Sequence, residues 1–89
     1  MSANYRSRYE QSWQELKRNK RIQVKFKNAS LAPRFIKAIR KRKNLDLAYR
    51  FALTSQNKKD RLSWKFLTAD SSILEINLTI SSISISDSL

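Results

Sequence analysis

A short stretch of the chain concentrates basic side chains at the spacing of one helix face. Within residues 34–44, RFIKAIRKRKN, Arg34, Lys37 and Lys41 recur every three or four positions, and Arg40 flanks them. Side chains at this spacing share one face of an α-helix, and these four would span about 10 Å at the helical rise. A cationic face of that length suits a polyanion, because each neutralised phosphate releases condensed counterions. The segment therefore predicts a surface that contacts phosphates.

The charge of the whole chain supports this interpretation. Its 89 residues include 19 Lys and Arg against 7 Asp and Glu, a formal net charge of +12. The basic residues lie early: residues 1–43 contain fourteen of them with two acids, whereas residues 66–89 contain none with three acids. No Asp or Glu occurs between Leu16 and Leu45. Because a surface kept only for solubility mixes both signs, this pattern predicts an anionic partner, with nucleic acid (DNA or RNA) foremost.

A second basic surface is expected on the outer face of a sheet. Alternation in the predicted strands places Lys25, Lys27, Arg50 and Lys65 away from the apolar side chains, beside a loop that contains Lys58 and Lys59. The alternative is ordinary polar strand residues, with Lys65 paired to Glu75 across a hairpin. The full set of predicted nucleic-acid-binding residues is Arg34, Lys37, Arg40, Lys41, Arg42, Lys43, Lys25, Lys27, Arg50, Lys58, Lys59 and Lys65.

The first half of the chain must position the basic helix. Ser7 and Glu10 have the spacing of a capping box and predict a helix over about residues 8–19. RIQVKFK alternates and predicts a strand over residues 21–27 with one wet face. Asn28 begins a turn and cap, and the basic helix that follows runs to about Lys43. Its expected buried stripe is Leu31, Phe35, Ala38 and Ile39, with Ile36 at the margin.

Residues 45–53 are ambiguous. LDLAYRFAL places five apolar residues in strict period two, which favours a strand, yet Leu and Ala favour helix and β-branched residues are missing. We place periodicity above propensity and predict a strand. If the segment is helical instead, the element order becomes α-β-α-α-β-β, that of a winged helix. This segment would then be the recognition helix, and only its Arg50 and Asp46 would be available to contact a DNA groove.

The second half predicts two more strands, over residues 61–68 and 73–80, after a polar loop at 55–60. The preferred fold is α+β, with two helices packed on one face of a small, mainly antiparallel sheet in the order α-β-α-β-β-β. Residues 1–81 form one domain. Residues 82–89 are a Ser/Ile-rich tail that is either disordered or donates a strand to a partner or a second copy, which would make a homo-oligomer.

The aromatic residues divide into two groups. Single-strand binders stack bases on exposed rings. Parity places four aromatic residues with the aliphatic set and so in the core: Tyr49, Phe51, Trp64 and Phe66. Tyr5 and Tyr9 lie among arginines and are better placed to stack on bases, unless they belong to a frayed terminus.

The residue types that are missing exclude several functions. Without cysteine and histidine the chain has no disulfide, no thiolate metal site and no imidazole base, so we expect no metal, no cofactor and no enzyme activity. No apolar run approaches a membrane span and the N-terminus lacks the apolar core of a signal peptide, so we expect a cytoplasmic protein. Glycine is also absent, and positive φ angles should fall mainly to Asn or Asp.

The preferred function is a non-enzymatic, nucleic-acid-binding accessory or regulatory protein. Two alternatives stay open. One is an adaptor or inhibitor that docks its basic face on an acidic protein. The other follows from size, charge and helix-then-sheet layout, in which the chain is similar to small basic ribonucleases of the RelE toxin type. Members of that class can work with Lys, Arg and Tyr and without histidine, so this resemblance implies ribonuclease activity.

Overall fold

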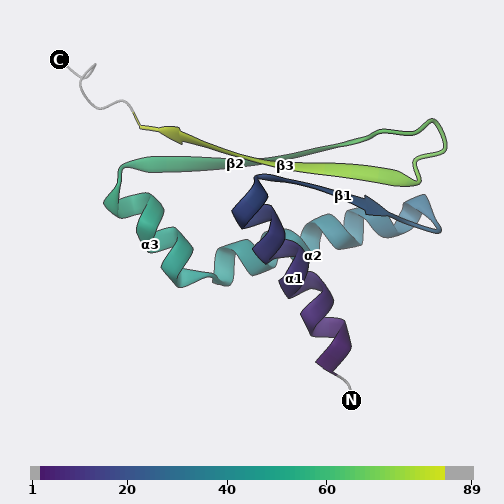
Figure 1. Ribbon diagram of the computed structural model, residues 1–89, viewed down its shortest axis with the longest axis horizontal. Coiled ribbons are helices and arrows are strands. Elements are labelled where there is room, and N and C mark those ends of the chain that lie inside the picture. The colour runs from purple at the N-terminus through teal and green to yellow at the C-terminus, as the bar shows by residue number, and fades with distance from the viewer. Residues whose placement is uncertain (1–2, 84–89) are drawn as a thin grey trace.

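The computed structural model describes residues 3–83, with side chains from Arg8 onward, and shows an α+β domain (Figure 1). The α+β class is confirmed, but the element order is α-β-α-α-β-β, the alternative rather than the preferred one. The elements are α1 (Ala3–Asn19), β1 (Arg21–Lys25), the 3-10 turn η1 (Ala29–Leu31), α2 (Ala32–Leu45), α3 (Leu47–Ser55), β2 (Lys58–Phe66) and β3 (Ile73–Ser82).

The strand predicted over residues 45–53 is wrong, because this segment ends α2 and forms most of α3. Asp46 is the cap of α3: its carboxylate accepts a hydrogen bond from the Tyr49 N–H at 3.1 Å. The period-two pattern does not mark one buried face. Leu47 and Phe51 are 76% and 74% exposed, whereas Tyr49 packs into the core. Helix propensity and the cap therefore outweighed the alternation.

Within residues 3–83 the sheet has three antiparallel strands in the order β1-β3-β2, and the helices α1, α2 and α3 lie on one side of it (Figure 1). This confirms the expected antiparallel sheet with helices on one face. The β2–β3 ladder runs without a break from Lys58 opposite Ser82 to Phe66 opposite Leu74, so β2 begins three residues earlier than predicted. Lys58 and Lys59 therefore lie in a strand and not in a loop. Most of the predicted tail, residues 84–89, lies outside the described residues.

The core lies where α1 and the start of α2 meet β1 and β3. Its fully buried side chains are Trp13, Leu16, Ala32, Ile39, Leu74 and Ile76. Ile22 in β1 and Phe26 just after it are also buried, as the alternation over residues 21–27 predicted, although β1 ends at Lys25. On α2 the expected stripe shifts slightly: Ile36 is buried, whereas Leu31 is 45% exposed.

The aromatic residues of β2 correct a second prediction. Trp64 and Phe66 lie opposite Ile76 and Leu74 in the ladder, so they face the helix side as expected. They are nevertheless 42% and 41% exposed, because α1 packs on β1 and β3 and α3 packs on β2 near Asp60. Together with Phe51, they are surface residues and not core. Only Tyr49 of the four predicted core aromatics is buried.

Asp46 ties α1 to the junction between α2 and α3. One carboxylate oxygen accepts hydrogen bonds from Trp13 Nε1 and Lys17 Nζ, both at 2.9 Å, and the other caps α3. Burial alone would raise the pKa of Asp46, but the hydrogen bonds from Lys17, Trp13 and the Tyr49 N–H hold this pKa below its usual value. This carboxylate is therefore charged at neutral pH and holds three helices together.

The start of α1 differs from the prediction, whereas its end at Asn19 agrees with it. The helix begins at Ala3, so Ser7 lies within it and the predicted capping box is wrong. The residue that follows, Lys20, has a φ of 69° and donates its N–H to the Leu16 carbonyl at 2.7 Å. Asn57 has the expected positive φ, but Ser71 joins Lys20 as an unexpected case.

Among the described residues, no helix is both long and apolar enough to cross a membrane.

Candidate nucleic-acid interface

The exposed side of α2 carries four of the predicted residues: Arg34, Lys37, Arg40 and Lys41, called here the α2 basic face. All four are exposed, and with Asn44 and Leu45 they line a shallow hollow of about 550 Å³. The ion pairs found between described residues use other cations. The structure thus brings these four together on one face whose charge no described acid neutralises.

Arg42 and Lys43, the next two predicted residues, are turned toward the protein. Arg42 lies 3.9 Å from Glu10 of α1, and Lys43 Nζ lies 3.2 Å from Asp60 of β2. Both side chains are half-buried. The structure therefore places these two cations in contacts between elements, apart from the α2 basic face.

A groove runs between α2 and the exposed end of β2, and it combines cations with aromatic rings. Its volume is about 380 Å³. The Arg40 guanidinium lies 5.5 Å from the centre of the Trp64 ring, a cation–π contact that joins the α2 basic face to the strand. Its lining residues are Ala32, Pro33, Ile36, Lys37, Arg40, Trp64 and Phe66. Sequence reasoning missed this groove, since the parity of the two aromatics indicated a side of the sheet and not its coverage.

The outer face of the sheet carries basic side chains as predicted, but an acid lies among them. Lys25 and Lys65 are exposed there, and Glu75 lies opposite Lys65 in the ladder, whereas Lys27 is exposed in the bend that follows β1. The Glu75 carboxylate is 3.8 Å from both Lys65 and Arg21, so the alternative of a Lys65–Glu75 pair is present. A hydrogen bond from Asn77 leads the contacts that lower the pKa of Glu75. The outer face of the sheet therefore carries charges of both signs.

Two cations that were not predicted share that outer face, Arg21 and Arg61, and the predicted Lys59 joins them as a strand residue. Each has the same parity as a residue already placed there, so the period-two signal could have found them. Trp64 and Phe66 alternate with Lys65 and so face the other way. The α2 basic face therefore adjoins the helix side of β2, not the outer face of the sheet.

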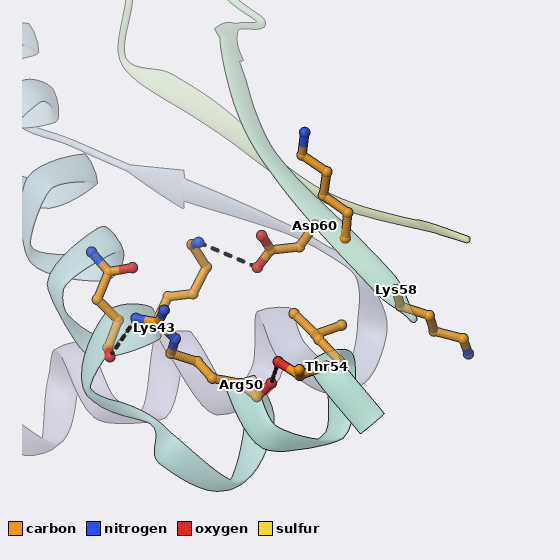
Figure 2. A pocket seen from close by; sticks show the side chains of 8 residues that line it. Lys43, Arg50, Thr54, Lys58 and Asp60 are labelled. Carbon is orange, nitrogen blue, oxygen red and sulfur yellow. Dashed lines mark hydrogen bonds and ion pairs between the residues drawn. The ribbon is translucent and has the colours of Figure 1, made fainter. Parts of the chain in front are cut away.

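Arg50 lies on α3 and not on the sheet, which corrects its predicted position. It borders a pocket of about 210 Å³ between α2, α3 and the start of β2 (Figure 2). One carboxylate oxygen of Asp60 lies 3.2 Å from Lys43 Nζ and accepts a hydrogen bond from the Tyr49 hydroxyl at 2.7 Å. Lys58 points away from Asp60 (Figure 2).

The polar groups around this pocket make contacts that hold α2, α3 and β2 together. Arg50 Nη1 donates to the Asn44 carbonyl at 3.4 Å, and Thr54 Oγ1 donates to the Arg50 carbonyl at 2.9 Å. Burial, followed by the hydrogen bond to Asp60, raises the pKa of Tyr49 above its ordinary value. A phenol held in this way is a hydrogen-bond donor at all physiological pH values. Its contacts link α3 to β2.

Two other positions offer little to a phosphate backbone. The exposed side of α3 is apolar at Leu47 and Phe51, and the turn at residues 67–72 contains no Lys or Arg. Tyr9 is half-buried against Phe35, with ring centres 5.6 Å apart, while the Tyr5 side chain lies outside the described residues.

No cluster of three or more potential His, Cys, Asp or Glu metal ligands occurs in the part of the chain that is described.

Comparisons with known proteins found no matching family model, no similar curated protein and no similar solved structure.

Proposed function

We propose that this protein binds nucleic acid without acting on it chemically, as an accessory or regulatory protein. The contact is made through the α2 basic face. One observation carries the proposal: four exposed cations share one side of a helix, and none of them pairs with a described acid. Such a face releases counterions when it meets phosphates, and this release drives binding.

The outer face of the sheet adds less to binding. Glu75 lies among its cations and engages Arg21 and Lys65, so part of that charge is already neutralised. Arg42 and Lys43 add little direct contact, because each is turned toward an acid of the protein itself. The basic helix is therefore the principal contact.

The test measures the affinity of a fluorescent oligonucleotide by anisotropy at several salt concentrations. Four phosphate contacts predict a slope of log affinity against log salt of about −3. Replacing Arg34, Lys37 and Lys41 together by Gln should reduce the magnitude of that slope to about 1. A matched variant, with Arg8, Arg18 and Arg61 replaced by Gln, removes the same charge elsewhere and should keep most of the slope.

Circular dichroism melting checks that both triple variants remain folded, as exposed positions allow. An affinity indifferent to salt would contradict the proposal, as would equal losses in the two variants. Gel analysis of the oligonucleotide, with RNA and ribosomes included, would reveal a ribonuclease by loss of intact RNA.

A second candidate function is docking on an acidic protein, and the exposed apolar side chains favour it. Leu45 borders the hollow on the α2 basic face, and Leu47 and Phe51 are largely exposed on α3. A protein partner would cover such residues, whereas a phosphate backbone would not. Pull-down from host lysate with and without nuclease separates the two: a partner retained after nuclease treatment indicates the adaptor.

A further inference from the structure

The groove between α2 and β2 is lined by two aromatic side chains that are exposed to solvent. Trp64 and Phe66 are two residues apart on one strand, so they lie on the same side about 6.6 Å apart along it. Their partners across the ladder, Ile76 and Leu74, are fully buried. The core therefore closes over β3 and leaves the rings of β2 open to solvent.

The charges around these rings have one sign. Lys37 and Arg40 border the groove, and none of the residues that line it is acidic. Arg40 already lies 5.5 Å from the Trp64 ring centre, so a cation is held at the aromatic surface before any ligand binds. A ligand that fits must present flat apolar faces and negative charge together.

We propose that this groove binds single-stranded nucleic acid, with unpaired bases stacked on Trp64 and Phe66. Lys37 and Arg40 contact the phosphates that flank those bases. The inference rests on the proposed nucleic-acid binding and specifies its form. Base stacking on protein aromatics requires bases that are not already stacked in a duplex, so the groove favours single strands.

Trp64 is also the natural reporter of this contact. The chain has two tryptophans, and Trp13 is 1% exposed, so only Trp64 can change strongly with a ligand in the groove. Adding oligothymidine of about twelve nucleotides, within the range of single-strand sites, should quench this emission. A duplex of the same length should leave the emission nearly unchanged.

Two variants separate stacking from simple packing. Trp64→Leu keeps an apolar side chain without a large ring and should weaken single-strand affinity roughly 5- to 150-fold. Trp64→Phe keeps a ring and should retain most of the affinity. Neither should change duplex affinity or the salt slope, because the phosphate contacts remain. Phe66→Leu repeats the test at the second ring, should either Trp64 variant fail to fold.

The outcomes distinguish this inference from the proposed function. If no oligonucleotide binds, the proposed function fails. If oligonucleotides bind with a steep salt slope but Trp64→Leu leaves single-strand affinity unchanged, stacking is refuted while nucleic-acid binding stands. Equal losses for single strands and duplexes would also refute stacking, since they would show that the ring supports the fold of the site.

Discussion

Replacing Asp46 by Ala should destabilise the protein more than any exposed substitution on α2. The change removes the α3 cap, worth about 1 kcal/mol, and the hydrogen bond from Trp13 to a charged acceptor, worth about 1.5 kcal/mol or more. The partly exposed Lys17 pair adds about 0.5 kcal/mol. These contacts are not strictly additive, and we expect a loss of about 3 kcal/mol in the free energy of unfolding.

The effect of Asp46 on stability depends on pH in a defined direction. Its pKa in the folded protein is lowered, so between this value and its unfolded pKa, about 3.9, the unfolded chain binds more protons. The stabilisation is therefore complete above the unfolded pKa and is lost as pH falls through the folded pKa. Asp46→Asn keeps a capping oxygen but carries no charge. It should therefore lack this pH dependence and be less stable than the wild-type protein at neutral pH.

Urea unfolding followed by circular dichroism at several pH values measures both effects. We expect the wild-type protein and Asp46→Asn to differ by a constant free energy at neutral pH, and the two curves to converge below about pH 4. Asp46→Ala should lie below both at neutral pH. A loss under about 1 kcal/mol for Asp46→Ala would refute the reasoning, since it would mean that the carboxylate does not connect α1 to α3.

Two further substitutions test particular backbone and surface positions. Lys20→Gly should raise the free energy of unfolding by about 0.5–1 kcal/mol, because a positive φ of 69° disfavours any residue with a Cβ; thermal melting measures it, and a lower melting temperature would contradict the assignment of the helix end. Phe51→Ser should change stability by less than about 0.5 kcal/mol in urea unfolding, because its side chain is 74% exposed; a loss of several kcal/mol would indicate the inward-facing strand of the original prediction.

Elements with one strong and consistent signal could be predicted from the sequence. The alternation over residues 21–27 and 73–80 correctly identifies Ile22, Phe26, Leu74, Ile76 and Leu78 as inward-facing. The basic spacing in α2 correctly places its four exposed cations on one face. In each of these segments the hydrophobic period agrees with the local propensity, so the pattern needs no tertiary information.

The prediction for residues 45–53 was wrong because two signals conflicted there, the period-two alternation and the helix propensity. Period two arises there from a mixture: Tyr49 and Leu53 pack inward at helical spacing, while Leu47 and Phe51 are exposed apolar residues on the other side. A sequence pattern counts all of them as buried. The capping role of Asp46 was the local signal that could have decided for helix.

The groove on β2 could not be predicted, for a different reason. Parity correctly assigns Trp64 and Phe66 to the helix side of the sheet, but exposure depends on which strands the helices cover. That coverage depends on the strand order β1-β3-β2 together with the packing of α1 on β1 and β3, which leaves this part of the edge strand β2 open. Strand order is a property of long-range packing, and a single sequence carries no direct signal of it.

The charges of α2 lead to a last prediction, in which stability and binding change in opposite directions. Lys37 lies three residues from Arg34 and Arg40 and four from Lys41, so it takes part in three repulsive pairs on the helix surface. Each like-charge pair destabilises a helix by about 0.2–0.5 kcal/mol, and reversing the central charge turns all three into attractions. Lys37→Glu should therefore raise the free energy of unfolding by roughly 1–3 kcal/mol at low salt.

The same variant should bind an oligonucleotide much more weakly, because it places a negative charge at the centre of the α2 basic face. Lys37→Gln is the matched control and should show about half of each effect. Urea unfolding and anisotropy on the same samples compare the two. If Lys37→Glu lowers stability, the four cations are not neighbours on one exposed face. If it binds as tightly as the wild-type protein, nucleic acid does not contact α2. Opposite changes in stability and affinity would mean that α2 retains mutually repelling cations because an anionic partner, and not the fold, requires them.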